Sequence, residues 1–373
     1  MRKVRTSSLD PIRSMVAFME ADEPMSKPQN DLFTDVPYDG DLVGPTATVH
    51  DLLKAKGRRG ASAYAARTAP EIGRRAPIDI LAGSRGGRII SVAADTNETA
   101  GALGSAATAA GHVYSGWCML GLPYRRPKGE KDNIWRISTD FADITVQSGT
   151  IKRDDGTTEL AGVPYGSYAR MALIALQSEA LEQGSRNIEL GETAYDTLKR
   201  LGLADGGKVA EMALAQLEKL ARCHVSFRIG TDLKGLEINE RLVDAFEYDT
   251  DGKTFIKRVR LSQAFFEGLR RHPVAIDRSA VQRIRNSPVA LDVYLWLAYR
   301  LPALERETAI TWSALHKQFG HGSEVVRFFK RPFAENCEMA RSVYPAANFR
   351  FTTTGIVLYP SPAPRRIKAI AAA

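Results

Sequence analysis

One order of predicted elements occurs twice along the chain and constrains its fold more than any other feature of the sequence. In its first occurrence, apolar periodicity predicts a core helix at residues 166–182, a short helix near 195–201 and a longer helix at 208–222. A glycine-containing turn at 202–207 separates the last two. Alternating apolar residues then predict strands, with a turn signal at 249–252 between them; the alternating residues are Val225, Phe227, Ile229, Val259 and Leu261.

The same order returns in residues 287–358. A strongly apolar helix is expected at 287–301, followed by a short helix, a turn at 320–323, a longer helix at 324–341 and a hairpin at 349–358. Helix, turn, helix and hairpin is the order of a winged helix. We therefore predict an α+β fold with two winged-helix domains in tandem.

Composition sets the expected limits of these domains. We place the first winged helix at residues 111–271, the second at 272–362, and a basic, alanine-containing tail at 363–373. Residues 1–110 are rich in small, polar and charged residues, with too few aromatic side chains to anchor a core, so this segment is expected to be largely disordered. Its aromatic residues are Phe18, Phe33, Tyr38 and Tyr64.

The positive charge is concentrated in the last third of the chain. The formal net charge is +8, and the sums over residues 1–105, 106–256 and 257–373 are +1, −4 and +11. A basic segment of this size favours an acidic partner such as nucleic acid. The three cysteines form no C-x-x-C pair and no apolar run is long enough to span a bilayer, so a cytoplasmic protein without membrane association is expected.

Helical geometry places four cations on one face of the helix at 324–341. At about 100° per residue, Arg327, Lys330, Arg331 and Arg341 share this face with Ala334 and Glu338. The opposite face is expected to be Val325, Phe328, Phe329, Phe333, Met339 and Val343. A basic face on the second helix of a helix-turn-helix is typical of a helix that enters the major groove.

Arg350 in the predicted hairpin and Lys317 in the short helix extend this candidate DNA-binding surface. The alternative is a solvated amphipathic face, which is the more common meaning of such a pattern in an isolated helix. Pro332 lies within the predicted helix, where it removes a backbone donor, so the helix is expected to bend or to restart there. The half that ends at Arg331 is therefore the safer assignment.

The helix at 208–222 carries a weaker version of the same pattern. Lys208, Lys219 and Arg222 share a face opposite a row of apolar residues, but Glu211 dilutes its charge. We include these three cations among the candidate DNA contacts. The alternative is a domain used for dimerisation or for binding a protein partner.

The sequence contains no complete catalytic or cofactor-binding motif. Residues 202–208 fit G-x-x-x-x-G-K, but Val209 stands where a phosphate-binding loop needs Ser or Thr, and a helix rather than a strand precedes the loop. The six histidines form no metal-binding motif, and the adjacent Asp154 and Asp155 lie in a polar turn. We expect no catalytic residues, no metal and no cofactor.

Four stretches of the chain resemble the plasmid-encoded RepA family of replication initiators. They are GVPYGSYAR at 162–170, SRNIELG at 185–191, SPVALDVYLWLAYRL at 287–301 and ITWSALHKQFG at 310–320. The resemblance extends over roughly residues 114–362 and leaves out the N-terminal hundred residues. Several matches in the same order make a chance similarity improbable.

The resemblance implies a non-enzymatic function. Proteins of this family bind direct repeats in double-stranded plasmid origin DNA, promote origin opening, recruit the host initiator and replicative helicase, and often repress their own promoter. A homodimer in equilibrium with a monomer is expected. The main alternative is a dedicated winged-helix transcriptional repressor without a role in replication.

Overall fold

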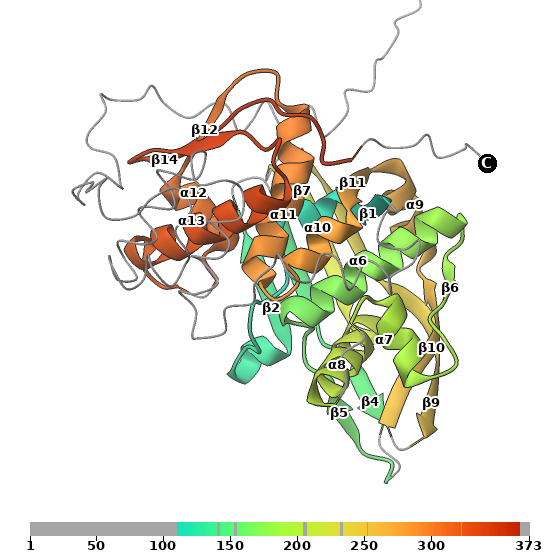
Figure 1. Cartoon of the computed structure of the whole chain (residues 1–373). Helices are drawn as coiled ribbons and strands as arrows, with labels where there is room; N and C mark the ends of the chain where they lie inside the picture. Colours follow the sequence, from blue (N-terminus) through green and yellow to red (C-terminus); the bar gives the residue numbers. More distant parts are fainter. Residues whose placement is uncertain are drawn as a thin grey trace, which may run out of the picture.

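The computed structural model describes residues 110–139, 142–152, 155–203, 207–231, 234–251, 253–321 and 323–365 (Figure 1). The region expected to be disordered, 1–110, lies outside the described residues except for Ala110, and so does most of the tail at 363–373. The fold is α+β, as predicted. Within the described ranges, no helix has the length and apolar character needed to cross a bilayer.

The first module consists of three helices and a three-stranded antiparallel sheet. Its sheet has the order β6-β10-β9, so the strand that follows the first helix pairs with the last strand of the module. In chain order the elements are α6 (Gly166–Gln183), β6 (Asn187–Glu189), α7 (Ala194–Arg200), α8 (Lys208–Arg222), β9 (Val243–Asp251) and β10 (Lys253–Leu261).

The second module repeats this topology. Its sheet has the order β12-β14-β13, so again the strand after the first helix pairs with the last strand. The elements are α11 (Pro288–Arg300), β12 (Thr308–Thr311), α12 (Trp312–Phe319), α13 (Val326–Val343), β13 (Phe349–Phe351) and β14 (Gly355–Leu358). The two occurrences of one element order in the sequence therefore correspond to two modules with the same strand pairing.

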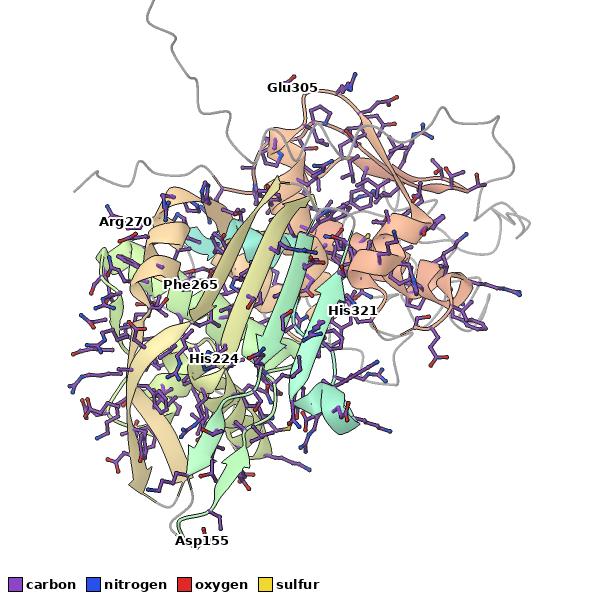
Figure 2. All side chains as sticks on the ribbon, turned by 180° about the vertical axis from the view of Figure 1, so that it is seen from behind. Asp155, His224, Phe265, Arg270, Glu305 and His321 are labelled. Atoms are coloured by element: carbon purple, nitrogen blue, oxygen red, sulfur yellow. The ribbon has the colours of Figure 1, made fainter. Side chains whose placement is uncertain are left out.

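A second sheet interrupts the first module between α8 and β9. Strands β7 (His224–Thr231) and β8 (Lys234–Arg241) join β2 (Ile134–Ser138) and β3 (Ala142–Gln147) in a four-stranded antiparallel sheet of order β2-β3-β7-β8 (Figure 2). The prediction that Val225 and Phe227 belong to the hairpin of the module is wrong, because both lie in β7 of this second sheet. Alternation of apolar residues shows that a strand is half-buried, but it does not specify the partner strand.

The remaining elements connect the modules. Strand β1 (Ala110–Tyr114) pairs with β11 (Pro273–Asp277), which follows α9 (Gln263–Arg271) and precedes α10 (Arg278–Arg283). Short elements complete the described chain: α5 (Ser115–Met119), η2 (Gly129–Asp132), β4 (Thr150–Lys152), β5 (Thr158–Leu160) and η3 (Leu301–Ala303). The apolar side chains of both modules form one continuous core, and α11 packs against α5, α6 and α13 within it.

Candidate nucleic-acid interface

Aromatic side chains fix the orientation of α13 on the second module. The rings of Phe329 and Phe333 lie 4.9 Å apart on one side of the helix, and Phe333 also contacts Phe319 of α12 at 5.1 Å. Trp312, the first residue of α12, lies edge-on to Phe333 at 6.4 Å. Because this cluster fills the space between α12 and α13, it determines which face of α13 is exposed.

The exposed face of α13 is concentrated in its first two turns. Arg327, Phe328, Arg331 and Pro332 are exposed, while Lys330 is half-buried with its ammonium 5.5 Å from the centre of the Trp312 ring. Arg331 forms an ion pair with Glu335 at 3.1 Å. In the described part of the chain, no carboxylate pairs with Arg327 or Lys330. The charges of these two side chains are therefore available to an external anion.

One part of the predicted helix face is wrong. Phe328 was expected to point into the core, yet it is 70% exposed, whereas Ala334 was expected beside the arginines and is only 4% exposed. The stripe that contacts the core runs through Phe329, Phe333, Cys337 and Ala340. Phe328 precedes this stripe by one residue, so it is rotated by about 100° away from it. Hydrophobicity alone does not show which of these two adjacent phenylalanines faces the core.

The proline does not divide the helix. Helix α13 continues through Pro332 to Val343, so the restart that the sequence allowed does not occur. The carboxamide of Asn336 donates a hydrogen bond to the carbonyl of Pro332 at 2.7 Å, and the hydroxyl of Ser287 donates to Asn336 Oδ1 at 2.7 Å. These bonds tie the middle of α13 to the start of α11.

Arg341 and Arg350 have partners within the second module. The guanidinium of Arg341 lies 3.7 Å from the centre of the Phe349 ring, donates to the Phe349 carbonyl at 2.6 Å and pairs with Glu338 at 3.2 Å. Arg341 thereby joins the end of α13 to β13. Arg350 is exposed, and its hydrogen bond to the Tyr359 hydroxyl at 2.7 Å raises the pKa of its guanidinium. Lys317 is exposed on α12.

The three cations predicted on α8 do not form one surface. Lys208 is exposed at the first turn. Lys219 is half-buried with its ammonium 5.5 Å from the centre of the Tyr165 ring, and burial lowers its pKa. Arg222 pairs with Glu218 at 3.0 Å and donates to the Thr150 carbonyl at 3.1 Å. Two of the three side chains are therefore engaged in contacts within the first module.

Helices α8 and α13 nevertheless share one pattern of burial. When Lys208 is aligned with Phe328, five of the six buried residues in each helix coincide, and Ala221 of α8 and Phe329 of α13 are the exceptions. The coinciding residues are Ala213, Leu214, Gln216, Leu217 and Leu220 in α8, and Phe333, Ala334, Asn336, Cys337 and Ala340 in α13. The equivalent exposed positions differ in chemistry, with Lys208, Glu211 and Met212 in α8 and Phe328, Arg331 and Pro332 in α13. The two helices are thus held alike by their modules but expose different faces.

Two cations in the hairpin of the first module, Lys257 and Arg258, pair with carboxylates. Lys257 pairs with Asp249 at 3.0 Å and with Glu192 at 3.3 Å, and these contacts raise the pKa of its ammonium. Arg258 pairs with Glu247 at 2.8 Å. Cations that already have carboxylate partners gain little from a phosphate, so Lys257 and Arg258 differ in this respect from Arg327 and Lys330 of the second module. Arg260 of the same hairpin is exposed.

The described residues contain neither a group of metal ligands nor the strand that precedes a phosphate-binding loop at residues 202–208. Among them, no three His, Cys, Asp or Glu side chains are grouped in a way that could hold a metal ion. Helix α7 ends at Arg200 and Lys208 opens α8, so a helix precedes the glycine-containing segment, of which residues 204–206 lie outside the described part. Asp155 accepts a hydrogen bond from the Thr157 amide at 2.8 Å, as in a polar turn, and Asp154 is outside the described residues.

The turn between α12 and α13 is fixed by residues that precede the first module. The ring of His321 stacks on Tyr124 at 5.3 Å and meets Trp135 of β2 edge-on at 5.4 Å. The carboxamide of Gln318 donates to the Met119 carbonyl at 2.6 Å. Nothing in the sequence pattern indicated these contacts, because the partners are almost two hundred residues apart. They hold the start of α13 in a defined position relative to the first module.

Comparison with known proteins supports this resemblance. Residues 163–314, a stretch that extends from the start of α6 into α12, match the model of a family described as "Plasmid encoded RepA protein". The resemblance noted in the sequence is thereby confirmed over these residues. No curated protein matches the chain.

Two solved structures also match part of the chain, and both are of domains 2 and 3 of RctB. A selenomethionine derivative has 15% sequence identity and a TM-score of 0.39, with 60% of this chain and 83% of that chain covered. The second has 13% identity and a TM-score of 0.37, with 64% of this chain and 92% of that chain covered. The similarity to the RepA family rests on the sequence match over residues 163–314 and not on these two structures.

Proposed function

We propose that this protein is a plasmid replication initiator that binds direct repeats in double-stranded origin DNA through the second module. In this proposal both modules are winged helices, and α13 is the helix that enters the major groove. The observation that supports it best is the pair of cations Arg327 and Lys330, which have no carboxylate partner in the described chain and lie beside Arg331 on the exposed start of α13. Lys317 and Arg350 extend the same surface to α12 and β13.

The first module has a different role in this proposal. Two of its hairpin cations are paired with carboxylates, and only Lys208 of its three candidate contacts is exposed. We assign it mainly to dimerisation, with a homodimer in equilibrium with a monomer. The protein acts in the bacterial cytoplasm, where DNA-bound copies recruit the host initiator and replicative helicase, and binding at its own promoter represses transcription.

The proposed protein does no chemistry itself, and this can be tested directly. Incubation of the full-length protein with ATP and magnesium, and separately with supercoiled plasmid and magnesium, should give neither hydrolysis nor nicking. Hydrolysis that is lost in a Lys208→Ala variant would show that the glycine-containing segment binds nucleotide after all.

A footprint on the DNA that flanks the gene of this protein tests the function. Protection of several direct repeats beside an AT-rich tract is the result expected of an initiator. Protection of a single operator, without repeats, would favour the alternative of a dedicated transcriptional repressor. Absence of any protected site would contradict both.

A further inference from the structure

Phe328 is the most exposed large apolar side chain of the described residues. It is 70% exposed, and Val325, at the cap of the same helix, is 49% exposed. The fold does not require an aromatic ring at this position, because Phe329 and Phe333 already fill the space between α12 and α13. The ring of Phe328 is therefore available for a contact outside the chain.

The surroundings of Phe328 define what can cover it. Arg327 and Arg331 lie one residue before it and three residues after it, and both are exposed. Pro332, one turn along the helix, is exposed as well and continues the apolar strip from Phe328. An occupant must therefore offer an apolar group between negative charges.

The major groove of DNA meets both requirements. Its phosphates border the groove on each side, and its one apolar group is the 5-methyl group of thymine, which aromatic and small apolar side chains contact. Cytosine, adenine and guanine present only hydrogen-bonding groups and ring edges there. A phenylalanine between cations on a helix in this groove would distinguish thymine from the other bases.

We propose that Phe328 reads thymine, through contact of its ring with thymine 5-methyl groups in the bound repeats. This inference rests on the proposed function, because it assumes that α13 lies in the major groove. In α8 the residue equivalent to Phe328 in the burial pattern is Lys208, which has no apolar surface of this kind at its tip. The first module therefore has no aromatic ring at the equivalent position.

The test replaces thymine by uracil, which lacks only the methyl group. The DNA that flanks the gene of this protein is amplified with dTTP or with dUTP, and the affinity of the full-length protein for each fragment is measured at one salt concentration. We expect the unaltered protein to bind the uracil fragment roughly three- to tenfold more weakly, as the loss of one or two buried methyl contacts implies. A Phe328→Ala variant should bind both fragments equally, at the weaker level, and Phe328→Leu should keep part of the difference.

Control variants distinguish a failure of this inference from a failure of the proposed function. Leu160→Ala, which removes another exposed apolar side chain, at the end of β5, should keep the full difference between the two fragments. Arg327→Ala should weaken binding to both fragments by the same factor.

Three results would overturn the proposal. Equal affinity of the unaltered protein for the two fragments does so, as does a Phe328→Ala variant that still prefers thymine. A Phe328→Ala variant that binds both DNAs like the unaltered protein but changes its mass in sedimentation would assign Phe328 to a contact between protein copies. If neither fragment is bound at all, the proposed function itself fails and this inference falls with it.

Discussion

The guanidinium of Arg170 in α6 and the carboxylate of Asp292 in α11 form a two-pronged ion pair, with Nε and Nη2 each 2.7 Å from a carboxylate oxygen. Their side chains are only 3% and 8% exposed. Arg170 also donates to the carbonyls of Leu122, Pro123 and Gly166, so the charge is well solvated by the protein. The pair joins the first helices of the two modules and thereby fixes the modules to each other.

Removal of one partner of this pair should destabilise the fold strongly. Asp292→Ala leaves the Arg170 guanidinium buried without its counter-charge, so the free energy of unfolding should fall by about 3–5 kcal/mol. Urea denaturation measures this directly. The double variant Arg170→Met, Asp292→Leu removes both charges and should recover part of the loss, because the carbonyls of Leu122 and Pro123 still lose their donor. A single variant within about 0.5 kcal/mol of the unaltered protein would show that the pair does not hold the modules together.

His321 should make the fold sensitive to mild acid. Its Nε2 atom is sealed from solvent and has no hydrogen-bond partner among the described residues, and burial, aided by Arg170 and His316, lowers its pKa from 6.5 to about 3. Between pH 6.5 and pH 3 the unfolded chain therefore binds a proton at His321 that the folded chain does not bind. The contribution of neutral His321 to the free energy of unfolding is fully present above pH 6.5 and is lost as the pH falls from 6.5 toward 3.

Denaturation at pH 7 and at pH 4.5 tests this expectation. The unaltered protein should lose about 1–3 kcal/mol more between these two values than a His321→Phe variant, which keeps the stacking on Tyr124 but cannot be protonated. The same loss in both proteins would place the acid sensitivity at another group.

The two adjacent phenylalanines of α13 should behave in opposite ways. Phe329 is 5% exposed and stacks on Phe333, so Phe329→Ala should lower the free energy of unfolding by about 3–5 kcal/mol. Phe328→Ala should change it by no more than about 0.5 kcal/mol, because its side chain is mostly in solvent. Thermal denaturation of the two variants measures the difference. Equal losses would mean that α13 is rotated relative to the orientation described above.

Arg341 should matter for stability rather than for binding DNA. An Arg341→Met variant loses the hydrogen bond to the Phe349 carbonyl and the contact with the Phe349 ring, so its free energy of unfolding should fall by about 1–3 kcal/mol. Its affinity for DNA, measured below the unfolding temperature, should keep the unaltered dependence on salt. A flatter dependence would show that this arginine reaches a phosphate.

The sequence was sufficient to predict the two modules and the positions of their helices. The short glycine-containing turns separate helices whose apolar periodicity is clear, so the expected helices at 208–222 and 324–341 correspond to α8 (Lys208–Arg222) and α13 (Val326–Val343). Most of the buried stripe of α8 was predicted as well, through Ala213, Leu214, Leu217 and Leu220, whereas the buried Gln216 was not. Local periodicity carries this information without any reference to distant partners.

What the sequence left open depends on contacts between distant residues. The rotation of α13 depends on α12, where Trp312 and Phe319 contact Phe333 and His316 contacts Phe329. The insertion of β7 and β8 depends on pairing with β3, more than seventy residues earlier. The role of Arg341 depends on Phe349. A cation on a helix has the same appearance in the sequence whether it meets a phosphate or an aromatic ring of its own module.

The central claim is that α13 contacts DNA through Arg327 and Lys330, and the salt dependence of binding tests it most directly. Each phosphate contact contributes about 0.9 to the slope of log affinity against log salt concentration, so the Arg327→Ala, Lys330→Ala double variant should flatten this slope by nearly 2 (about 2 × 0.9). The matched control is Lys257→Ala, Arg258→Ala in the first module, where both cations are paired with carboxylates and the slope should not change. An unchanged slope in the Arg327→Ala, Lys330→Ala variant would remove α13 from the interface and contradict the account.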